Sequence, residues 1–186
     1  AGRPGAACAG CGLMLALLRP GEIALRTVGP FDLGRLARLH RACFREPWSR
    51  ADLSQLLAMP GAFGLVARCR ERTPFGVDAF RSAGFALVRI VGSEAELLSL
   101  GVAPPFRRRG VGAALLREAM ARCRQAGCSL MFLEVATDNE AALRLYVAHG
   151  FRQVGLRPDY YRYADGTSSH AYTMRCDLDA ANCAVD

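Results

Sequence analysis

Apolar and polar side chains recur along the chain with two periods, and each period predicts a different kind of element. Alternation with period two, or a short apolar run, predicts strands at residues 22–28, 62–70, 84–91, 96–102, 130–135, 151–156 and 171–176. Helical spacing of apolar residues predicts helices at residues 33–44, 49–59, 111–126 and 140–149. The second to fourth strands are expected to form an antiparallel meander. The pattern therefore predicts a sheet combined with several amphipathic helices.

Local signals set the ends of these elements. Asp32 is placed to cap the first helix, and Ser49 with Asp52 three residues later forms a capping-box pattern before the second helix. Gly127 is placed to end the third helix. Residues 158–166, rich in tyrosine and turn-forming residues, predict a loop that joins the last two strands as a hairpin.

Length and composition fit one folded domain. The chain has 186 residues, of which 52% are hydrophobic and 22% charged, so wholesale disorder is excluded. The charge balance is less ordinary, because 24 basic residues against 17 acidic ones give a net charge of +7, and every basic residue is arginine. A basic surface suits nucleic acid, an acidic partner or a polyphosphate cofactor, and charge alone does not choose among them.

The ends of the chain differ from its middle. Residues 1–21 are rich in glycine and alanine and are expected to be a disordered N-terminal extension, which leaves a domain at residues 22–178 and a C-terminal tail at 179–186. The apolar run at residues 13–18 is too short to span a bilayer. We therefore expect a soluble, cytoplasmic protein without a membrane partner, with a monomer as the favoured state.

The eight cysteines are expected to be buried or free thiols, because the chain is long and lacks a secretory signal. Cys8 and Cys11 form the only CxxC pair in the sequence. A zinc site would require a second cysteine pair or a histidine pair at ligand spacing, and the sequence shows neither. No metal site is expected.

The most informative stretch is the junction between the strand at residues 96–102 and the helix that follows. It consists of Arg107, Arg108, Arg109, Gly110, Val111, Gly112 and Ala113. A helix N-terminus offers free backbone N–H groups and a favourable dipole, glycines allow close approach, and arginines neutralise an anion. The order lacks the Gly-Lys-Ser/Thr ending of a P-loop and the three-glycine fingerprint of a dinucleotide-binding turn. The junction predicts a phosphate-containing ligand, and a solvated basic turn is the alternative.

Two polar residues in apolar surroundings add candidate chemistry. Glu134 lies near the end of an apolar strand, where a carboxylate requires an explanation, although most single carboxylates at strand ends simply face water. Tyr146 lies on the helix that follows, where it could be a packed core residue whose hydroxyl needs a partner. Either residue alone is compatible with a structural role.

Residues 97–151 resemble the acetyl-CoA-binding core of the GNAT N-acetyltransferase superfamily. Three pieces in the right order carry the resemblance: the strand LLSLGV, the turn RRRGVGA for the family's Arg/Gln-x-x-Gly-x-Gly/Ala, and the run LEVATDNEAALRLYVAHGF. That run, with the PWS at residues 47–49 and the paired tyrosines at 160–161, is similar to the RimI-type ribosomal-protein alanine N-acetyltransferase branch. The resemblance extends over most of residues 22–178.

The resemblance implies an α/β (α+β) fold with a GNAT-like mixed, mostly antiparallel central sheet and helices on both faces. It implies an acyltransferase that moves an acetyl group from acetyl-CoA to the N-terminal α-amine of a protein, and the similar branch points to the N-terminal alanine of a ribosomal protein. Glu134 would act as general base and Tyr146 as general acid.

The same resemblance assigns binding residues. CoA would contact the arginine and glycine junction through its pyrophosphate and the preceding strand through its pantetheine arm. The implied cofactor-binding residues are Leu100, Gly101, Val102, Arg107, Arg108, Arg109, Gly110, Val111, Gly112, Ala113, Asn139 and Tyr146. The acceptor groove would involve Trp48, Glu134, Tyr160 and Tyr161.

Two alternatives stay open. Another GNAT enzyme could acetylate a small amine or a lysine, and Glu134 and Tyr146 do not exclude this. A non-catalytic basic module binding ribosomes or nucleic acid would explain the arginine content but not the paired base and acid; nucleic acid is otherwise not expected as a partner except through the ribosome. Ala136 and Ala103 depart from the residues common in relatives, so the acceptor contacts near Ala136 are not carried over.

Overall fold

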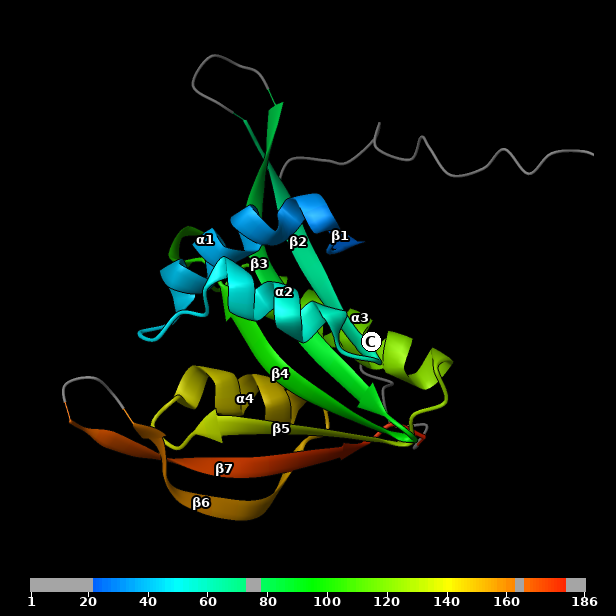
Figure 1. Ribbon diagram of the computed structural model, residues 1–186, viewed down its shortest axis with the longest axis vertical. Helices are drawn as coiled ribbons and strands as arrows, with labels where there is room; N and C mark the ends of the chain where they lie inside the picture. The colour runs from blue at the N-terminus through cyan, green and yellow to red at the C-terminus, as the bar shows by residue number, and fades with distance from the viewer. Residues whose placement is uncertain (1–21, 73–77, 163–165, 180–186) are drawn as a thin grey trace, which may run out of the picture.

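The structure is a computed structural model that describes residues 22–72, 78–162 and 166–179 (Figure 1). The predicted N-terminal extension, nearly all of the predicted tail, and the CxxC pair lie outside the described residues. The described strands form one sheet in the order β1-β2-β3-β4-β5-β7-β6. Their bounds are β1 Ile23–Thr27, β2 Ala62–Arg72, β3 Asp78–Val91, β4 Glu94–Val102, β5 Leu130–Ala136, β6 Arg152–Arg162 and β7 Ser168–Asp177.

Every neighbouring pair in this sheet is antiparallel except β4 and β5, which run parallel. The long connection between these two strands contains a helix, as a parallel pair requires. The predicted mixed, mostly antiparallel sheet is therefore confirmed. The β2-β3-β4 meander is confirmed as well, and β3 begins earlier than its apolar run suggested.

Helices cover both faces of the sheet, as predicted. Their bounds are α1 Leu33–Cys43, α2 Arg50–Ala58, α3 Val111–Gln125 and α4 Glu140–Ala148, with short 3-10 turns at Pro30–Asp32 and Pro104–Phe106. In Figure 1, α1 and α2 cross in front of the sheet and α3 runs behind it. Two neighbouring strand positions show the same division: a Cβ on Gly84 would meet Leu115 of α3, whereas one on Gly101 would meet Cys43 of α1.

The helix starts follow local signals with one exception. Ser49 and Asp52 form the predicted capping box, in which the Asp52 N–H donates to the Ser49 hydroxyl at 3.2 Å. The prediction that Asp32 caps α1 is wrong, since its side chain makes no cap bond to α1. The Asp32 carboxylate instead accepts from the guanidinium groups of Arg26 and Arg35 and from a turn N–H. Charge-assisted bonds are stronger than a cap bond, and the Arg26 bond lowers the Asp32 pKa.

The predicted loop at residues 158–166 is also largely wrong. Strand β6 continues to Arg162, so Tyr160 and Tyr161 lie on a strand; residues 163–165 lie outside the described part. The sequence misled because Pro158 normally ends a strand. Here β6 is an edge strand, and its pairing with β7 shifts register between Arg157 and Tyr161, which accommodates the proline.

Other expectations concern cysteines, metals and membranes. In the described ranges, five cysteines are present and none forms a disulfide: Cys43, Cys69, Cys123, Cys128 and Cys176. Within the same ranges, histidine, cysteine, aspartate and glutamate side chains do not gather in a group of three or more that could hold a metal ion. None of the described helices has the length and apolar character needed to cross a bilayer.

Candidate active site

The parallel strands β4 and β5 separate halfway along their length. Their pairing ends at Leu97 and Leu133, although β4 continues to Val102 and β5 to Ala136. At the same point the pairing of β4 with β3 shifts register and leaves Leu98 as an extra, bulged residue. A cleft of about 1530 Å³ occupies the resulting gap. The sequence predicted both strands but gave no sign of the bulge.

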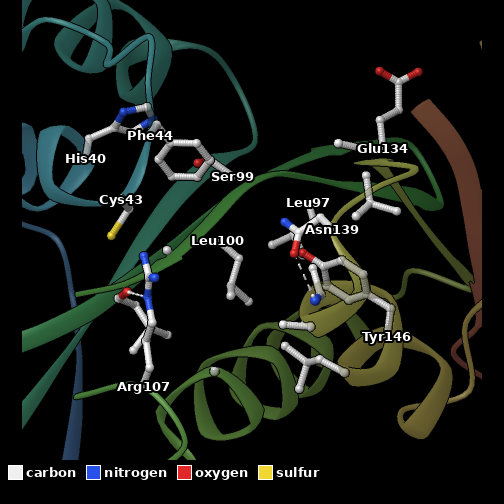
Figure 2. Close-up of a pocket in the computed structure, with 18 of the residues that line it drawn as sticks. His40, Cys43, Phe44, Leu97, Ser99, Leu100, Arg107, Glu134, Asn139 and Tyr146 are labelled. Atoms are coloured by element: carbon white, nitrogen blue, oxygen red, sulfur yellow. Dashed lines mark hydrogen bonds between the residues drawn. The ribbon is translucent and has the colours of Figure 1, made fainter. Parts of the chain in front are cut away.

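The cleft opens toward both faces of the sheet. Gly112 of α3 and Tyr146 of α4 line it on one face, and His40 and Phe44 of α1 line it on the other. A Cβ on Gly112 would lie 3.3 Å from Leu145 and 3.6 Å from Val102, so α3, α4 and β4 meet closely there. Chain segments far apart in the sequence therefore share one cavity across the sheet (Figure 2).

The predicted phosphate junction forms the start of α3. Gly110 is the N-cap with φ 77°, a left-handed conformation that favours glycine, and Arg108 has φ 61°. The first N–H groups of α3 have no acceptor within the helix and lie at the positive end of its dipole. Every residue of the junction except one lines the cleft: Arg107, Arg108, Gly110, Val111, Gly112 and Ala113.

Arg109 is the exception. Its guanidinium bonds the Glu71 carboxylate at 3.3 Å and stacks over the Phe106 ring at 5.6 Å. Arg109 is therefore directed toward β2 rather than into the cleft, and the structure does not group it with the other predicted cofactor-binding residues.

The predicted strand residues Leu100, Gly101 and Val102 all line the cleft. They lie beyond the last β4–β5 pair, so in the described sheet their backbone edge on the β5 side has no partner strand. Arg107 donates from its Nε to the Val102 carbonyl at 3.1 Å, so that carbonyl is already engaged. Backbone groups alternate in direction along a strand, and Ala103 donates its N–H to Ala83 of β3, so the groups of Leu100 and the Val102 N–H face the open side and can pair with an extended ligand.

Asn139 and Tyr146 come from α4. The Asn139 Oδ1 accepts from the Ala142 N–H at 3.2 Å as the helix N-cap, which fixes the amide and leaves its Nδ2 group to face the cleft that Asn139 lines. Tyr146 is only 6% exposed and packs against Phe151, with ring centroids 5.8 Å apart. Burial, and to a lesser degree the neighbouring Tyr161, raise the pKa of the Tyr146 phenol, so it stays protonated.

Glu134 has partners that the sequence did not indicate. The Arg157 guanidinium donates to its Oε1 at 2.5 Å and stacks over the Tyr160 ring at 4.4 Å. A hydrogen bond to Glu134, together with burial, raises the pKa of Tyr160 to about 12. Tyr161 donates from its hydroxyl to the Glu134 carbonyl at 3.4 Å. Both predicted acceptor-groove tyrosines are thus brought to Glu134, along with an arginine that sequence reasoning missed.

In Figure 2 the Glu134 carboxylate points away from the Tyr146 ring, which is directed toward Asn139. Along β5 the neighbours Leu133 and Val135 are buried, whereas Glu134 occupies the alternate, less buried face. Tyr146 is buried among apolar residues on the α4 side. The carboxylate and the phenol therefore approach the β4–β5 gap from opposite faces of the sheet.

An aromatic wall borders the cleft on the α1 face. His40 stacks on Phe44 at 4.5 Å, on Trp48 at 4.9 Å and on Phe85 at 5.4 Å. Trp48 was predicted as an acceptor-groove residue, and it lines the cleft. His40 and Phe44 were read only as positions on a helix, because helical spacing does not reveal that one turn of the helix borders a cavity.

The arrangement fits a long ligand with a phosphate at one end and a reacting group at the other. Arginines and helix N–H groups stand at the α3 end, apolar side chains and an open strand edge follow, and a carboxylate and a phenol flank the gap. Such a cleft can hold an acyl carrier and bring its acyl group to an amine.

Comparison with known proteins agrees with this chemistry. The acetyltransferase (GNAT) family model matches residues 33–151. The chain is 38% identical over 149 residues to the N-alpha-acetyltransferase RimI of Mycobacterium tuberculosis, a match that covers 78% of this chain and 87% of the relative.

Solved structures show the same fold. The ribosomal-protein-S18-alanine N-acetyltransferase from Escherichia coli has a TM-score of 0.73 at 25% identity, covering 89% of this chain and 99% of that one. Arabidopsis thaliana NAA60, solved in complex with acetyl-CoA, has a TM-score of 0.73 at 24% identity, covering 84% and 98%. The chain therefore belongs to the GNAT acetyltransferase family and is an acetyl-CoA-dependent N-acetyltransferase.

Proposed function

We propose that the chain acetylates the N-terminal α-amine of a protein, and that its acceptor is the N-terminal alanine of a ribosomal protein. The single observation that carries the proposal is the cleft through the sheet, with Glu134 on one face of the β4–β5 gap and Tyr146 on the other. The printed functions of the similar proteins from Mycobacterium tuberculosis and Escherichia coli support the choice of acceptor.

The residues on the α3 side fit acetyl-CoA. Arg107 and Arg108, with the N–H groups at residues 111–113, would hold its pyrophosphate. Leu100 and Leu145 would flank the pantetheine arm, and the amide of Asn139 would contact the arm from the α4 side. When bound, acetyl-CoA supplies the thioester that the amine attacks.

Glu134 would take the proton of the acceptor. An α-ammonium has a pKa near 8, so a carboxylate acting directly or through one water suffices to release the free amine. In the structure the Glu134 carboxylate holds the Arg157 guanidinium. The α-ammonium of an arriving acceptor would replace that guanidinium at the Glu134 carboxylate. The carboxylate would therefore be paired with a cation both before and after the acceptor binds.

Tyr146 would assist the leaving thiolate. Its phenol is neutral, and its pKa lies above that of a thiol, whose ordinary value is about 8.5. Complete proton transfer from Tyr146 to a thiolate is therefore uphill, whereas a hydrogen bond from the phenol stabilises the thiolate as it forms. On the opposite face, Trp48, Tyr160 and Tyr161 would enclose the N-terminal residue of the acceptor next to Glu134.

One experiment tests the acceptor class. The protein is incubated with acetyl-CoA and short peptides that begin with alanine, serine or methionine, and in parallel with a polyamine and a peptide whose single amine is a lysine side chain. Mass spectrometry should show one added acetyl group on the N-terminus of the alanine peptide. Acetylation confined to the polyamine or the lysine peptide would refute the proposal.

A further inference from the structure

Ser99 carries a buried hydroxyl without a partner. The residue is 8% exposed, and its Oγ makes no hydrogen bond to any group in the described part of the chain. A buried polar group left unsatisfied costs about 1–3 kcal/mol, so it calls for a reason. The hydroxyl oxygen itself is covered, but Ser99 lines the cleft, so a ligand that displaces the covering side chain would be its partner.

His40, a second lining residue, carries a ring N–H that could also donate to a ligand. The residue is 2% exposed, and its Nδ1 accepts a hydrogen bond from the Trp48 N–H at 3.2 Å. Burial lowers the pKa of His40 to about 4, so the ring is neutral. A neutral imidazole that accepts at Nδ1 carries its proton on Nε2. Among the described residues, the Nε2–H of His40 has no acceptor, and His40 also lines the cleft.

Both groups lie on the α1 face of β4. Ser99 and Gly101 share one face of the strand because side chains alternate. Gly101 contacts Phe85, which in turn stacks on His40 at 5.4 Å. Leu100 points to the other face, toward Gly112 of α3. Figure 2 likewise shows His40 and Ser99 together beside Phe44, apart from Tyr146.

We propose that His40 and Ser99 form a subsite that binds the carbonyl oxygen of the acceptor's first peptide bond. Two hydrogen-bond donors on one wall suit an oxygen with two lone pairs, and the aromatic side chains around them exclude water that would compete. The α1 face carries Trp48, whereas Gly112 of the phosphate junction meets Leu145 of α4 on the other face, which assigns the oxygen to the acceptor rather than to acetyl-CoA. This inference rests on the proposed function.

The subsite gives a physical reason for preferring protein N-termini over simple amines. In a peptide, a carbonyl stands one carbon away from the α-amine, so it reaches the cleft wall whenever the amine is at the reacting position. A polyamine or a lysine side chain has no carbonyl at that distance. Such acceptors would leave both buried donors unsatisfied, which is the kind of mismatch that discriminates strongly between ligands.

Ser99→Ala tests the subsite with little risk to folding, because it removes a hydroxyl that has no partner in the protein. The acceptors are an alanine peptide, its isostere with an alkene in place of the first peptide bond, and the matching depsipeptide, which keeps the carbonyl but lacks the N–H. We expect kcat/KM to fall roughly 5- to 10-fold for the peptide and the depsipeptide, the loss of about one hydrogen bond. The alkene isostere should be a poor substrate of both proteins, with no further loss in the variant.

The KM for acetyl-CoA and the thermal midpoint should not worsen in Ser99→Ala. Ser54→Ala, at an exposed serine of α2, is the matched control and should leave every constant unchanged. An equal loss on all three acceptors, or a raised KM for acetyl-CoA, would overturn the proposal and assign the oxygen to the thioester.

A binding experiment separates this inference from the proposed function. Alaninamide is added to the protein with CoA, and the imidazole resonances of the three histidines are followed by NMR. A shift confined to His40 and absent in Ser99→Ala supports the subsite even if no peptide is turned over. No shift at His40 refutes the subsite, whatever the peptides show.

Discussion

The two halves of the cleft are built from different material. On the α3 side the ligand meets backbone: the N–H groups that follow Gly110, the open edge of β4 and the close approach at Gly112. On the α1 side it meets side chains held by other side chains, such as Glu134 with Arg157. A site made of backbone groups loses its ligand when the main chain is displaced or a side chain fills the space. A site made of side chains loses its function when one functional group is replaced. Substitutions should therefore separate the two halves.

The largest effect is expected at Glu134. Glu134→Gln keeps the shape of the side chain but removes the proton acceptor, so turnover should fall roughly 100-fold or more. Because Glu134 lies on the acceptor side, the affinity for acetyl-CoA should stay unchanged. Steady-state kinetics and a thermal-shift titration with acetyl-CoA measure both quantities. An unchanged turnover would remove Glu134 from the base role.

The next effect is expected on the backbone side. Gly112→Leu places a side chain where even a Cβ lies 3.3 Å from Leu145, so it fills the slot and should weaken acetyl-CoA binding roughly 10- to 100-fold. Calorimetric titration with acetyl-CoA measures the loss. Gly92→Ala is the control for a glycine outside the cleft, since its Cβ position has open space, although its φ of 60° adds local strain. Equal acetyl-CoA affinity in Gly112→Leu and the wild type would contradict the assignment of the cleft beside Gly112 to acetyl-CoA.

A smaller effect distinguishes neighbouring arginines of the junction. Arg107→Ala removes a guanidinium that lines the cleft and should weaken acetyl-CoA binding roughly 5- to 10-fold, the loss of about one ordinary hydrogen bond, because Arg107 is exposed to solvent. Arg109→Ala should leave the affinity unchanged, because Arg109 is bonded to Glu71 outside the cleft. The same titration compares the two variants. Equal losses would mean that the basic turn acts only through its total charge.

The smallest effect is expected at Arg157. Arg157→Gln removes the cation that an acceptor ammonium must replace, so the KM for an alanine peptide should fall about 2- to 5-fold, in keeping with the 0.2–1 kcal/mol of exposed ion pairs. Peptide kinetics at saturating acetyl-CoA provide the test. Arg152→Gln is the control, because Arg152 lies on β6 like Arg157 and its ion pair is with Asp177 of β7. A raised KM in Arg157→Gln would show that Arg157 helps to bind the acceptor instead.

The contrast between the halves also explains what the sequence could predict. The backbone half comes from one continuous stretch of sequence, residues 96–113, in which the strand, the glycines and the helix start follow one another. Short-range rules apply there, and all but Arg109 of the predicted junction lines the cleft. Arg109 could not be placed from the sequence because its partner, Glu71, lies on another strand.

The side-chain half is assembled from α1, β4, β5 and β6, so its contacts depend on pairing that no local pattern contains. Glu134 stood out because a carboxylate is unusual in an apolar strand, and Tyr146 because of the family resemblance. Arg157, Ser99 and His40 gave no such signal. The bulge at Leu98 and the continuation of β6 through Pro158 likewise depend on partner strands.

The most direct test of the account is the binding of a conjugate in which CoA is joined through its acetyl group to the N-terminus of an alanine peptide. If the two halves meet at the β4–β5 gap, calorimetry should show that the conjugate binds roughly 100-fold or more tightly than CoA. Binding of the CoA part would hold the peptide part next to its own half of the cleft and so raise its effective concentration. Arg107→Ala and Ser99→Ala should each remove part of that gain. A conjugate that binds no more tightly than CoA would contradict the account, because the acceptor side would then not be part of the same cleft.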